Sequence, residues 1–353
     1  MPIKTLAPTS NILLIRLRRI GDIVMTTPAV TLLKNHFPGV SVTYLVEEPF
    51  RRLVEGNPNL EKVIAVPRGQ KTRDFFSLIR SVRREKFDAI LDFHGGPRAS
   101  WLTFLSGAGL KVGYAIRGKG FLYDVRIPRG REGGHVHSVV NHANLVRALG
   151  AQFSDADIPP LFLPEAKPEE ASRVADIVSE AGARGKARGK TVALHVGAGN
   201  RFRDWGVSNI LGLVALLSRI PETKIFLIGG NDDQEIARTL LGSAHEAVTS
   251  LVGRLNLIEI RELISRVSLF VGPDSGPMHI AASTPTPIVA YFGPTLPEVF
   301  APWRPSGGKT VILEKSLECR PCRQVQCATE DYRCLQTITP EEVFAASARF
   351  LKS

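Results

Sequence analysis

The stretch ILLIRLRRIGDIV, residues 12–24, decides the fold. Its apolar, β-branched start predicts a buried strand over residues 12–16, and Gly21 permits a tight turn into a helix expected over residues 23–35. The same alternation of short apolar strands and helical segments continues through both halves of the chain. It indicates parallel sheets wound with helices, the α/β class.

Two series of such elements follow one another, separated by a boundary region over residues 152–190 that is rich in proline and glycine, including Gly182, Gly185 and Gly189. The first series has further expected strands at residues 40–46, 62–66, 89–93 and 111–114 and helices at 75–84, 100–105 and 138–149. The second has strands at 191–196, 224–228, 247–251, 269–271 and 288–292 and helices at 208–218, 232–241, 257–267 and 276–282.

This pattern predicts two Rossmann-like doubly wound domains, residues 1–165 and 166–339. Ligand crevices are expected at the carboxyl ends of the strands, facing a central cleft. A last helix within residues 340–353 can pack on either domain, including back on the first.

The chain is strongly basic. Its 353 residues include 45 Lys and Arg against 34 Asp and Glu, a formal net charge of +11. This excess favours a polyanionic partner: nucleic acid, an anionic membrane surface or a phosphorylated substrate. Aromatic residues make up only 7% of the sequence and are not interleaved with a basic stripe, which argues against nucleic acid. The sequence shows neither a secretory signal nor a stretch of transmembrane length, so we expect a cytoplasmic protein.

Asp22 follows the turn at Gly21 and stands at the mouth of the first expected crevice. Because Asp is a preferred helix N-cap, a structural role is one interpretation of this residue. The other interpretation is catalytic, since a carboxylate at a helix start stays ionised and can accept a proton. The two roles are compatible, and the residues alone leave both open.

Three strands of the second series are expected to end in glycine turns, each followed by charged residues. The turns and charged residues are Gly197-Ala198-Gly199 with Arg201 and Arg203, Gly229-Gly230 with Asp232 and Asp233, and Gly272. Backbone N–H groups at small residues can approach a phosphate, arginines can neutralise it, and carboxylates can hydrogen-bond a ribose. Plain loops and capped helix starts are the alternative for each turn alone. Three such turns in one domain favour a nucleotide-like ligand.

The segment after Gly272 carries the strongest signal. Asp274 and Ser275 precede a helix that begins at Gly276, so their side chains and the first backbone N–H groups are expected to converge on one anion-binding spot. His279, about one turn further along, is either a ligand contact or a satisfied buried histidine.

All four cysteines of the chain fall in one short segment: Cys319, Cys322, Cys327 and Cys334. The first spacing suits a metal knuckle, whereas the other two are irregular. A structural zinc or iron ion and free or partly buried thiols are both open interpretations of this cluster.

Together these segments resemble glycosyltransferase family 9, the ADP-heptose:lipopolysaccharide heptosyltransferases. The matching motifs run from about residue 11 to the C-terminus: Arg18-Arg19-Ile20-Gly21-Asp22 with Thr27-Pro28 and Phe37-Pro38, Val196-Gly197-Ala198 with Trp205, Gly229-Gly230, residues 272–279, residues 292–295 and the cysteine segment. The resemblance implies a GT-B architecture with an acceptor-binding first domain and a second domain that binds an ADP-linked sugar. It also implies an inverting reaction that needs no metal.

The resemblance further implies roles for single residues, with Asp22 as the general base. The donor-binding residues would be Gly197, Ala198, Arg203, Gly229, Gly230, Asp232, Asp233, Asp274, Ser275, Gly276 and His279. The acceptor-binding residues would be Arg18, Arg19, Gly21, Arg51 and Arg98, of which the arginines suit acidic sugars and phosphates. Arg203 departs from the family, which often has lysine there, and either Asp232 or Asp233 would replace a ribose-binding glutamate.

The implied function is transfer of a heptose from ADP-heptose to the inner core of lipopolysaccharide or lipooligosaccharide, by an enzyme peripheral at the inner face of the inner membrane. Alternatives are another sugar donor, a protein acceptor, or a non-catalytic nucleotide-binding protein. The last would keep the glycine turns of the second half and would not need Asp22.

Overall fold

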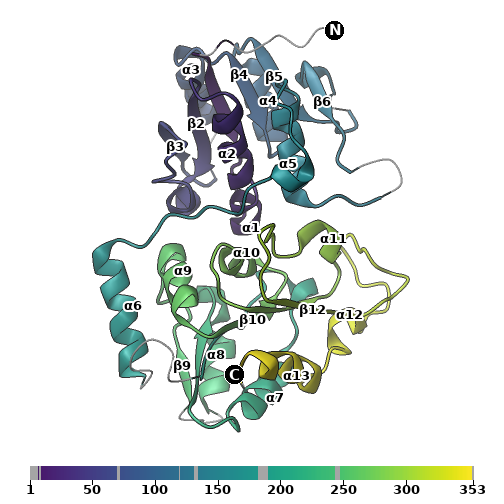
Figure 1. The fold of residues 1–353 in the computed structure, drawn as a ribbon. Coiled ribbons are helices and arrows are strands. Elements are labelled where there is room, and N and C mark those ends of the chain that lie inside the picture. Colours follow the sequence, from purple (N-terminus) through teal and green to yellow (C-terminus); the bar gives the residue numbers. More distant parts are fainter. Residues whose placement is uncertain are drawn as a thin grey trace. The chain divides into compact units, whose positions relative to one another are not determined.

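The computed structural model describes residues 7, 9–69, 72–118, 120–130, 134–181, 190–242 and 247–351. Gly182, Gly185 and Gly189 of the expected boundary region lie outside these residues, as do residues 352–353 of the last expected helix. The chain divides into two compact units, Met1–Pro164 and Glu165–Ser353 (Figure 1).

A six-stranded parallel sheet forms the centre of the first unit, in the order β3-β2-β1-β4-β5-β6. Its strands are β1 (Asn11–Ile15), β2 (Ser41–Glu47), β3 (Lys62–Val66), β4 (Ala89–Asp92), β5 (Leu110–Tyr114) and β6 (Val125–Ile127). β1 pairs in parallel with β2 and β4, so that Ile12 lies opposite Val42 on one side and Ala89 on the other. The apolar side chains of β1 are buried on both faces of the sheet, which explains its unbroken apolar sequence.

Helices cover both faces of this sheet. They are α1 (Ile20–Val24), α2 (Thr27–His36), α3 (Thr72–Arg84), α4 (Pro97–Leu105) and α5 (Ser138–Arg147), with 3₁₀ turns η1 (Glu48–Leu53), η2 (Gly120–Leu122) and η3 (Asp155–Asp157). α3 and α4 pack on one face, where Val82 and Leu102 join Leu13 and Ile90 in a shared core. α2 and α5 contact each other on the opposite face, which is toward the viewer in Figure 1.

The helix expected over residues 23–35 is interrupted. α1 ends at Val24 and α2 begins at Thr27, and between them the Thr26 hydroxyl donates a hydrogen bond to the Ile23 carbonyl at 2.7 Å. Pro28, in the first turn of α2, has no N–H with which to continue the hydrogen bonds of α1. The single expected helix is therefore wrong, and a short separate helix carries Asp22.

The second unit repeats this winding, with β7 at the position of β1, in the order β12-β11-β10-β7-β8-β9. Its strands are β7 (Lys190–His195), β8 (Thr223–Ile228), β9 (Val248–Ser250), β10 (Leu269–Pro273), β11 (Ile288–Phe292) and β12 (Thr310–Glu314). Its helices are α6 (Pro168–Glu180), α7 (Val207–Leu217), α8 (Gln234–Gly242), α9 (Leu257–Arg266), α10 (Gly276–Ala282), α11 (Pro297–Phe300), α12 (Arg333–Gln336) and α13 (Pro340–Leu351), with 3₁₀ turns η4 (Arg201–Arg203) and η5 (Asn231–Asp233).

Five helices and strands of the described residues lie outside the expected pattern besides the split helix: β6, β12, α6, α11 and α12. β6 and β12 are edge strands without a fully buried residue, so they lack the strong apolar signal of the central strands. α6 begins at Pro168, a residue that is well suited to the first turn of a helix but that we interpreted as part of a boundary. Arg173 of α6 pairs with Glu259 of α9 at 2.6 Å, which fixes this helix to the second unit.

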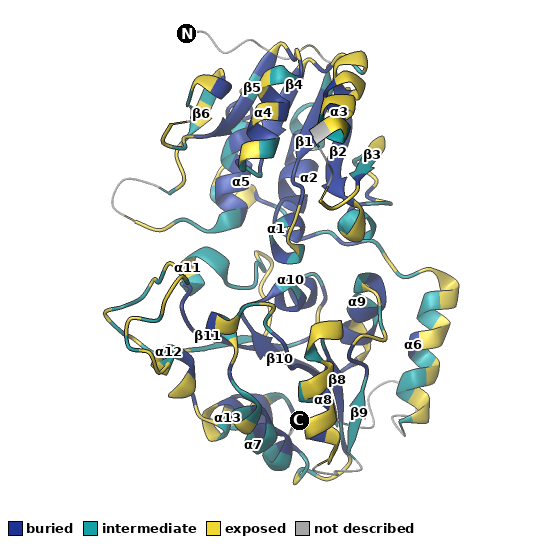
Figure 2. Cartoon of the chain, turned by 180° about the vertical axis from the view of Figure 1, so that it is seen from behind, coloured by how far each residue is buried: buried dark blue, intermediate teal, exposed yellow. Residues whose placement is uncertain are grey.

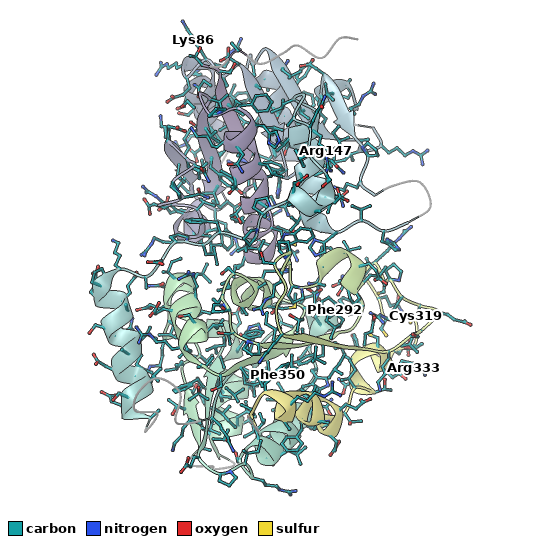
Figure 3. The ribbon with its side chains drawn as sticks, viewed as in Figure 1. Lys86, Arg147, Phe292, Cys319, Arg333 and Phe350 are labelled. Atoms are coloured by element: carbon teal, nitrogen blue, oxygen red, sulfur yellow. The ribbon has the colours of Figure 1, made fainter. Side chains whose placement is uncertain are left out.

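The last helix belongs to the second unit. Val343, Ala346 and Leu351 of α13 enter the core that contains β7 and α7, and Phe350, labelled in Figure 3, packs against that core. The suggested return of this helix to the first domain is therefore wrong, because its apolar face is covered within its own unit. Among the residues that the structure describes, no helix is long and apolar enough to cross a membrane.

Candidate functional site

Asp22 lies in the first turn of α1, directly beyond the carboxyl end of β1. Its carboxylate forms an ion pair with Arg16, whose buried guanidinium also donates a hydrogen bond to the Phe93 carbonyl at 2.6 Å. The N-cap of α1 is Arg19, and no side chain caps this helix, so the N-cap interpretation of Asp22 is wrong. The Asp22 side chain keeps 29% of its surface exposed. It is thus oriented by a buried cation and still reachable from solvent.

The neighbouring strand β4 ends in a buried polar network that the sequence did not reveal. The Asp92 carboxylate accepts hydrogen bonds from the backbone N–H groups of His94 and Gly95 at 2.8 and 2.9 Å, and from the Tyr123 hydroxyl at 2.7 Å. Burial raises the pKa of Asp92. Burial, together with the positive charge of Arg16, lowers the pKa of His94 to about 4. His94 is therefore neutral at physiological pH.

The arginines expected to bind an acceptor fall into three places. Arg18 and Arg19 are exposed in the loop that leads to α1, next to Gly21 and Asp22. Arg51 lies on η1, which contacts α1, and it pairs with Glu55 at 2.9 Å. Arg98 lies on α4, with its guanidinium 5.5 Å from the centre of the Phe75 ring on α3. The structure thus groups Arg18, Arg19 and η1 with Asp22, whereas Arg98 faces α3.

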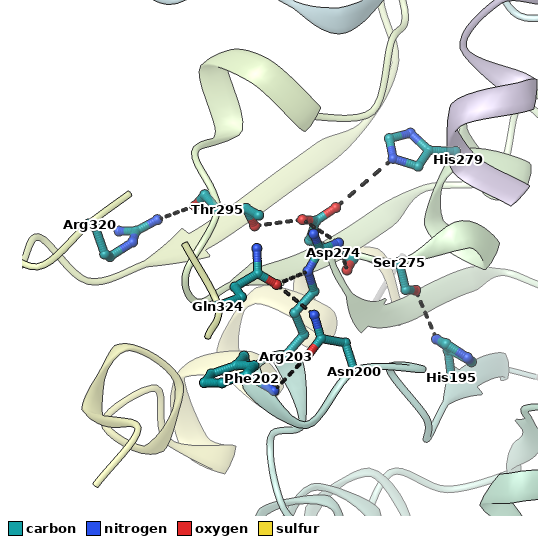
Figure 4. Close-up of polar contacts among 10 residues, drawn as sticks. All are labelled: His195, Asn200, Phe202, Arg203, Asp274, Ser275, His279, Thr295, Arg320 and Gln324. Atoms are coloured by element: carbon teal, nitrogen blue, oxygen red, sulfur yellow. Dashed lines mark hydrogen bonds and ion pairs between the residues drawn. The ribbon is translucent and has the colours of Figure 1, made fainter. Parts of the chain in front are cut away.

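In the second unit, Asp274 is the centre of a buried network that follows β10 (Figure 4). Its carboxylate accepts a hydrogen bond from the Thr295 hydroxyl at 2.5 Å and pairs with Arg203 at 3.1 Å. His279 Nε2 lies 4.0 Å from the other carboxylate oxygen. Only 3% of the Asp274 side chain is exposed. Asp274 therefore joins β10, η4, α10 and the residues after β11.

Ser275 turns to a different partner. It is the N-cap of α10, but its side chain does not cap the helix; its hydroxyl lies 3.0 Å from His195 Nδ1 at the end of β7. Burial lowers the pKa of His195 to about 4, so the imidazole is neutral. The expected convergence of the Asp274 and Ser275 side chains on one spot is wrong, since each is bonded to its own partners.

The cysteine segment, residues 319–334, contacts the network around Asp274 through Gln324. The Gln324 side-chain oxygen accepts hydrogen bonds from Asn200 Nδ2 at 2.7 Å and Arg203 Nε at 3.1 Å. Arg320 of the same segment donates to the Thr295 carbonyl at 2.8 Å. Sequence reasoning gave no role to Gln324 or Thr295: Thr295 belongs to the matching motif at residues 292–295, directly after β11, but was assigned no contact, and Gln324 lies in the irregular cysteine segment without a recognisable turn.

The glycines after β7 and β8 accommodate a side chain of the protein itself. The Asp233 carboxylate lies against both: a Cβ on Gly197 would come within 2.1 Å of it and one on Gly229 within 2.7 Å. The Gly230 N–H donates to the same carboxylate at 2.8 Å, and burial raises the pKa of Asp233. Asp232, in contrast, is exposed. We expected these glycines to let a phosphate or ribose come close to the backbone. Gly197 and Gly229 have a packing role in addition, because they leave room for the Asp233 side chain.

The four cysteines line one pocket together with Phe202, Arg320 and Tyr332, in the segment marked by Cys319 and Arg333 in Figure 3. All four are free thiols. Their sulfurs contact groups of the same segment, as Cys322 Sγ accepts from the Gln324 N–H and Cys327 Sγ lies 3.5 Å from the Thr329 hydroxyl. Within the described ranges, no group of three or more His, Cys, Asp or Glu side chains has an arrangement that could hold a metal ion. A structural zinc or iron at this cluster is therefore not supported.

Two α/β units of identical winding, each with a polar cluster beyond the carboxyl ends of its central strands, make up the GT-B fold. The family model described as glycosyltransferase family 9 (heptosyltransferase) matches residues 75–333. The chain belongs to this family, which confirms the resemblance seen in the motifs, and it is a glycosyltransferase.

Individual relatives agree over nearly the whole chain. Lipopolysaccharide heptosyltransferase 3 of Escherichia coli is 26% identical, over 94% of this chain and 97% of the relative. A solved structure of a family 9 glycosyltransferase from Veillonella parvula has a TM-score of 0.85 at 21% identity, over 99% of both chains. The E. coli ADP-heptose lps heptosyltransferase II has a TM-score of 0.77 at 20% identity, over 97% of this chain and 98% of that one.

Proposed function

We propose that this glycosyltransferase moves a heptose from ADP-heptose to the inner core of lipopolysaccharide or lipooligosaccharide, with inversion at the anomeric carbon and without a metal. Family membership supports the reaction class, and the names of the similar enzymes support the sugar, the nucleotide and the acceptor. The observation that carries the mechanism is the partly exposed carboxylate of Asp22, held by Arg16 at the end of β1.

Asp22 acts as the general base in this proposal. It takes the proton from the acceptor hydroxyl while that oxygen forms a bond to the anomeric carbon. The bond between that carbon and the diphosphate oxygen breaks on the opposite face, and ADP leaves with the electron pair. Arg16 orients the carboxylate for this step and is a positioning residue.

The second unit binds the donor in this proposal. Arg203 provides the positive charge for the leaving diphosphate, and its contacts with Asp274 and Gln324 fix its side chain at η4. Gly276 and His279 line the same site on α10, with Ser275 held by His195. Gly197, Ala198, Gly229 and Gly230 form the two turns that receive the nucleotide.

We assign the ribose contact to Asp232 rather than Asp233. The Asp233 carboxylate already accepts the Gly230 N–H and fills the space beside Gly197 and Gly229. Asp232 is exposed on the same turn, η5, so its carboxylate can accept hydrogen bonds from ribose hydroxyls. An Asp232→Ala variant would raise KM for the donor, whereas Asp233→Ala would lower the thermal stability.

The acceptor is held by the first unit in this proposal. Arg18 and Arg19 beside Gly21, with Arg51 on η1, supply positive charge to the phosphates and acidic sugars of the inner core. Arg98 adds charge on α4. The enzyme is proposed to work in the cytoplasm, peripheral at the inner face of the inner membrane, where such an acceptor is assembled.

The test offers the purified protein a panel of ADP-, UDP- and GDP-sugars with truncated lipopolysaccharide acceptors, in EDTA, and identifies the product by mass. A heptose added from ADP-heptose is the expected result, and ADP-sugars should raise the melting temperature more than the others. Transfer from another nucleotide sugar, a requirement for added metal, or the absence of transfer to any of these acceptors would overturn the corresponding part of the proposal.

A further inference from the structure

The first unit exposes an aromatic cluster, consisting of Trp101 and Phe104 on α4 and Phe121 on η2. Their side chains are 44%, 41% and 67% exposed. The ring centres lie 5.9 Å apart for Trp101 and Phe104, and 6.3 and 6.2 Å from each of these to Phe121. The inner face of α4 is buried in the core, through Ala99 and Leu102. The cluster is therefore a continuous apolar surface on the outside of the unit.

Basic side chains surround this cluster. The Arg126 guanidinium lies over Gly120, next to Phe121, because a Cβ on Gly120 would come within 2.9 Å of it. Arg83 reaches the end of α4: a Cβ placed on Gly107 would lie 3.7 Å from the Arg83 Nε. Figure 2 shows the exposed residues along α3 and α4.

The outer side of α3 continues the surface. Arg73, Phe76, Arg80 and Arg84 recur at intervals of three or four residues, so they lie on one side of the helix, and all four are exposed. We call α3, α4 and η2 with these side chains the basic aromatic face.

The charge of the whole chain is concentrated in the segment that builds this face. Residues 68–131 contain 14 Lys and Arg and 5 Asp and Glu, a net charge of +9 out of the +11 of the chain. All other residues together contribute +2. The basic excess is thus local in the sequence, and the segment that carries it includes α3, α4 and η2.

We propose that the basic aromatic face docks on an anionic lipid bilayer. Tryptophan and other aromatic rings favour the boundary between headgroups and acyl chains, and Lys and Arg side chains near an anionic surface are attracted to its negative charge. A second copy of the chain does not fit, because apposing two such faces brings the arginines of one copy against those of the other. The inference rests on the proposed location at the inner membrane and deepens it by naming the surface that binds; it can be tested apart from the transfer reaction, since bilayer binding needs neither donor nor acceptor.

The experiment measures sedimentation of the full chain with vesicles of phosphatidylethanolamine and phosphatidylglycerol at 3:1, and with phosphatidylcholine vesicles, without substrates. Two double variants test the face: Trp101→Ser with Phe121→Ser, and Arg80→Gln with Arg84→Gln. Matched controls change exposed residues of the second unit: Leu241→Ser with Val325→Ser, and Arg219→Gln with Arg238→Gln.

The wild type should bind phosphatidylglycerol vesicles at least tenfold more tightly than phosphatidylcholine vesicles, and added salt should weaken this binding. Each variant of the face should bind about tenfold more weakly, while both controls bind like the wild type. All variants should keep the melting temperature and the transfer activity on a dissolved truncated acceptor. Equal vesicle binding by variants and controls would overturn the proposal, as would a wild-type dimer in light scattering that the aromatic variant abolishes. A lack of transfer activity with intact vesicle binding would instead contradict the proposed function alone.

Discussion

Asp22 and Asp274 each lie just beyond the carboxyl end of a central strand, Asp22 after β1 of the first sheet and Asp274 after β10 of the second, yet their surroundings differ. The Asp22 carboxylate has one cationic partner, Arg16, and keeps 29% of its side chain exposed. The Asp274 carboxylate has a hydroxyl, a guanidinium and a nearby imidazole around it and is 3% exposed. A carboxylate that must accept a proton from a substrate has to remain accessible. A carboxylate that holds loops together is instead stable when both of its oxygens have hydrogen-bond or ion-pair partners within the protein. The difference supports the proposed catalytic role of Asp22 and indicates a structural role for Asp274.

The largest effect is expected for Asp22→Asn. Loss of the base should lower kcat about 10³-fold, because general base catalysis contributes roughly that factor. The affinity for ADP should stay close to the wild type, because Asp22 belongs to the unit that does not bind the donor in the proposal. The melting temperature should fall modestly, since the buried Arg16 loses its carboxylate but keeps its hydrogen bond to the Phe93 carbonyl. Glu85→Gln, which changes an acid paired with Lys62 on the same unit, is the control and should retain activity. Unchanged turnover in Asp22→Asn would exclude it as the base.

Asp274→Asn should act on stability instead. It removes the charge that pairs with Arg203 and leaves a partly buried guanidinium without its carboxylate, at a cost of about 3 kcal/mol in the free energy of unfolding. Denaturant unfolding measures this loss, and donor binding should weaken with it. If Asp274→Asn lost activity at wild-type stability, the contrast with Asp22 would disappear.

The pH dependence of stability should contain a contribution from His195. Its pKa is lowered from an ordinary value of 6.5 to about 4 by burial, so the unfolded chain binds a proton first as the pH falls. The free energy of unfolding should therefore decrease from pH 6.5 to pH 5, by about 1.5 kcal/mol for this group. His195→Asn should remove that part of the slope, while a substitution of the exposed His135 should not. An identical slope in both variants would contradict the neutral buried state of His195.

The smallest effect is expected for Gln324→Ala. The variant removes the oxygen that accepts hydrogen bonds from Asn200 and Arg203, worth about 1 kcal/mol, and should raise KM for the donor about fivefold with little change in stability. Restoring an amide oxygen one methylene closer, in Gln324→Asn, should recover part of the loss. Val325→Ala, an exposed neighbour, is the control. An unchanged KM would mean that Arg203 is positioned by Asp274 alone.

The central strands of both sheets could be predicted from the sequence because they are buried on both faces and carry unbroken apolar runs. Edge strands such as β12 could not, since none of its residues is fully buried. The helix break at Thr26 could not be predicted from apolar periodicity either. It depends on one hydrogen bond of the Thr26 hydroxyl and on the proline at residue 28.

The site could be predicted as far as chain position determines it. Asp22, Asp274 and the glycine turns stand directly after strands, so their location follows from the winding of the sheet. The partners of these residues come from distant positions: Gln324 is 121 residues from Arg203, and no local pattern connects them. Tertiary packing decides whether a carboxylate faces solvent, an arginine or a glycine. For Asp233, the contact with two glycines became evident only from the structure.

Because Asp233 contacts Gly197 and Gly229, the residues allowed at each of these three positions depend on the residues at the other two. A methyl group at residue 197 or 229 would collide with the carboxylate at residue 233, so the double change to alanine at 197 and 233 should be tolerated better than Gly197→Ala alone. In related chains, a side chain at the first position is then expected to accompany a small residue at the third. Gly197 and Gly229 resemble part of a nucleotide-binding signature. They are also the residues that leave room for the Asp233 side chain in the turn after β8.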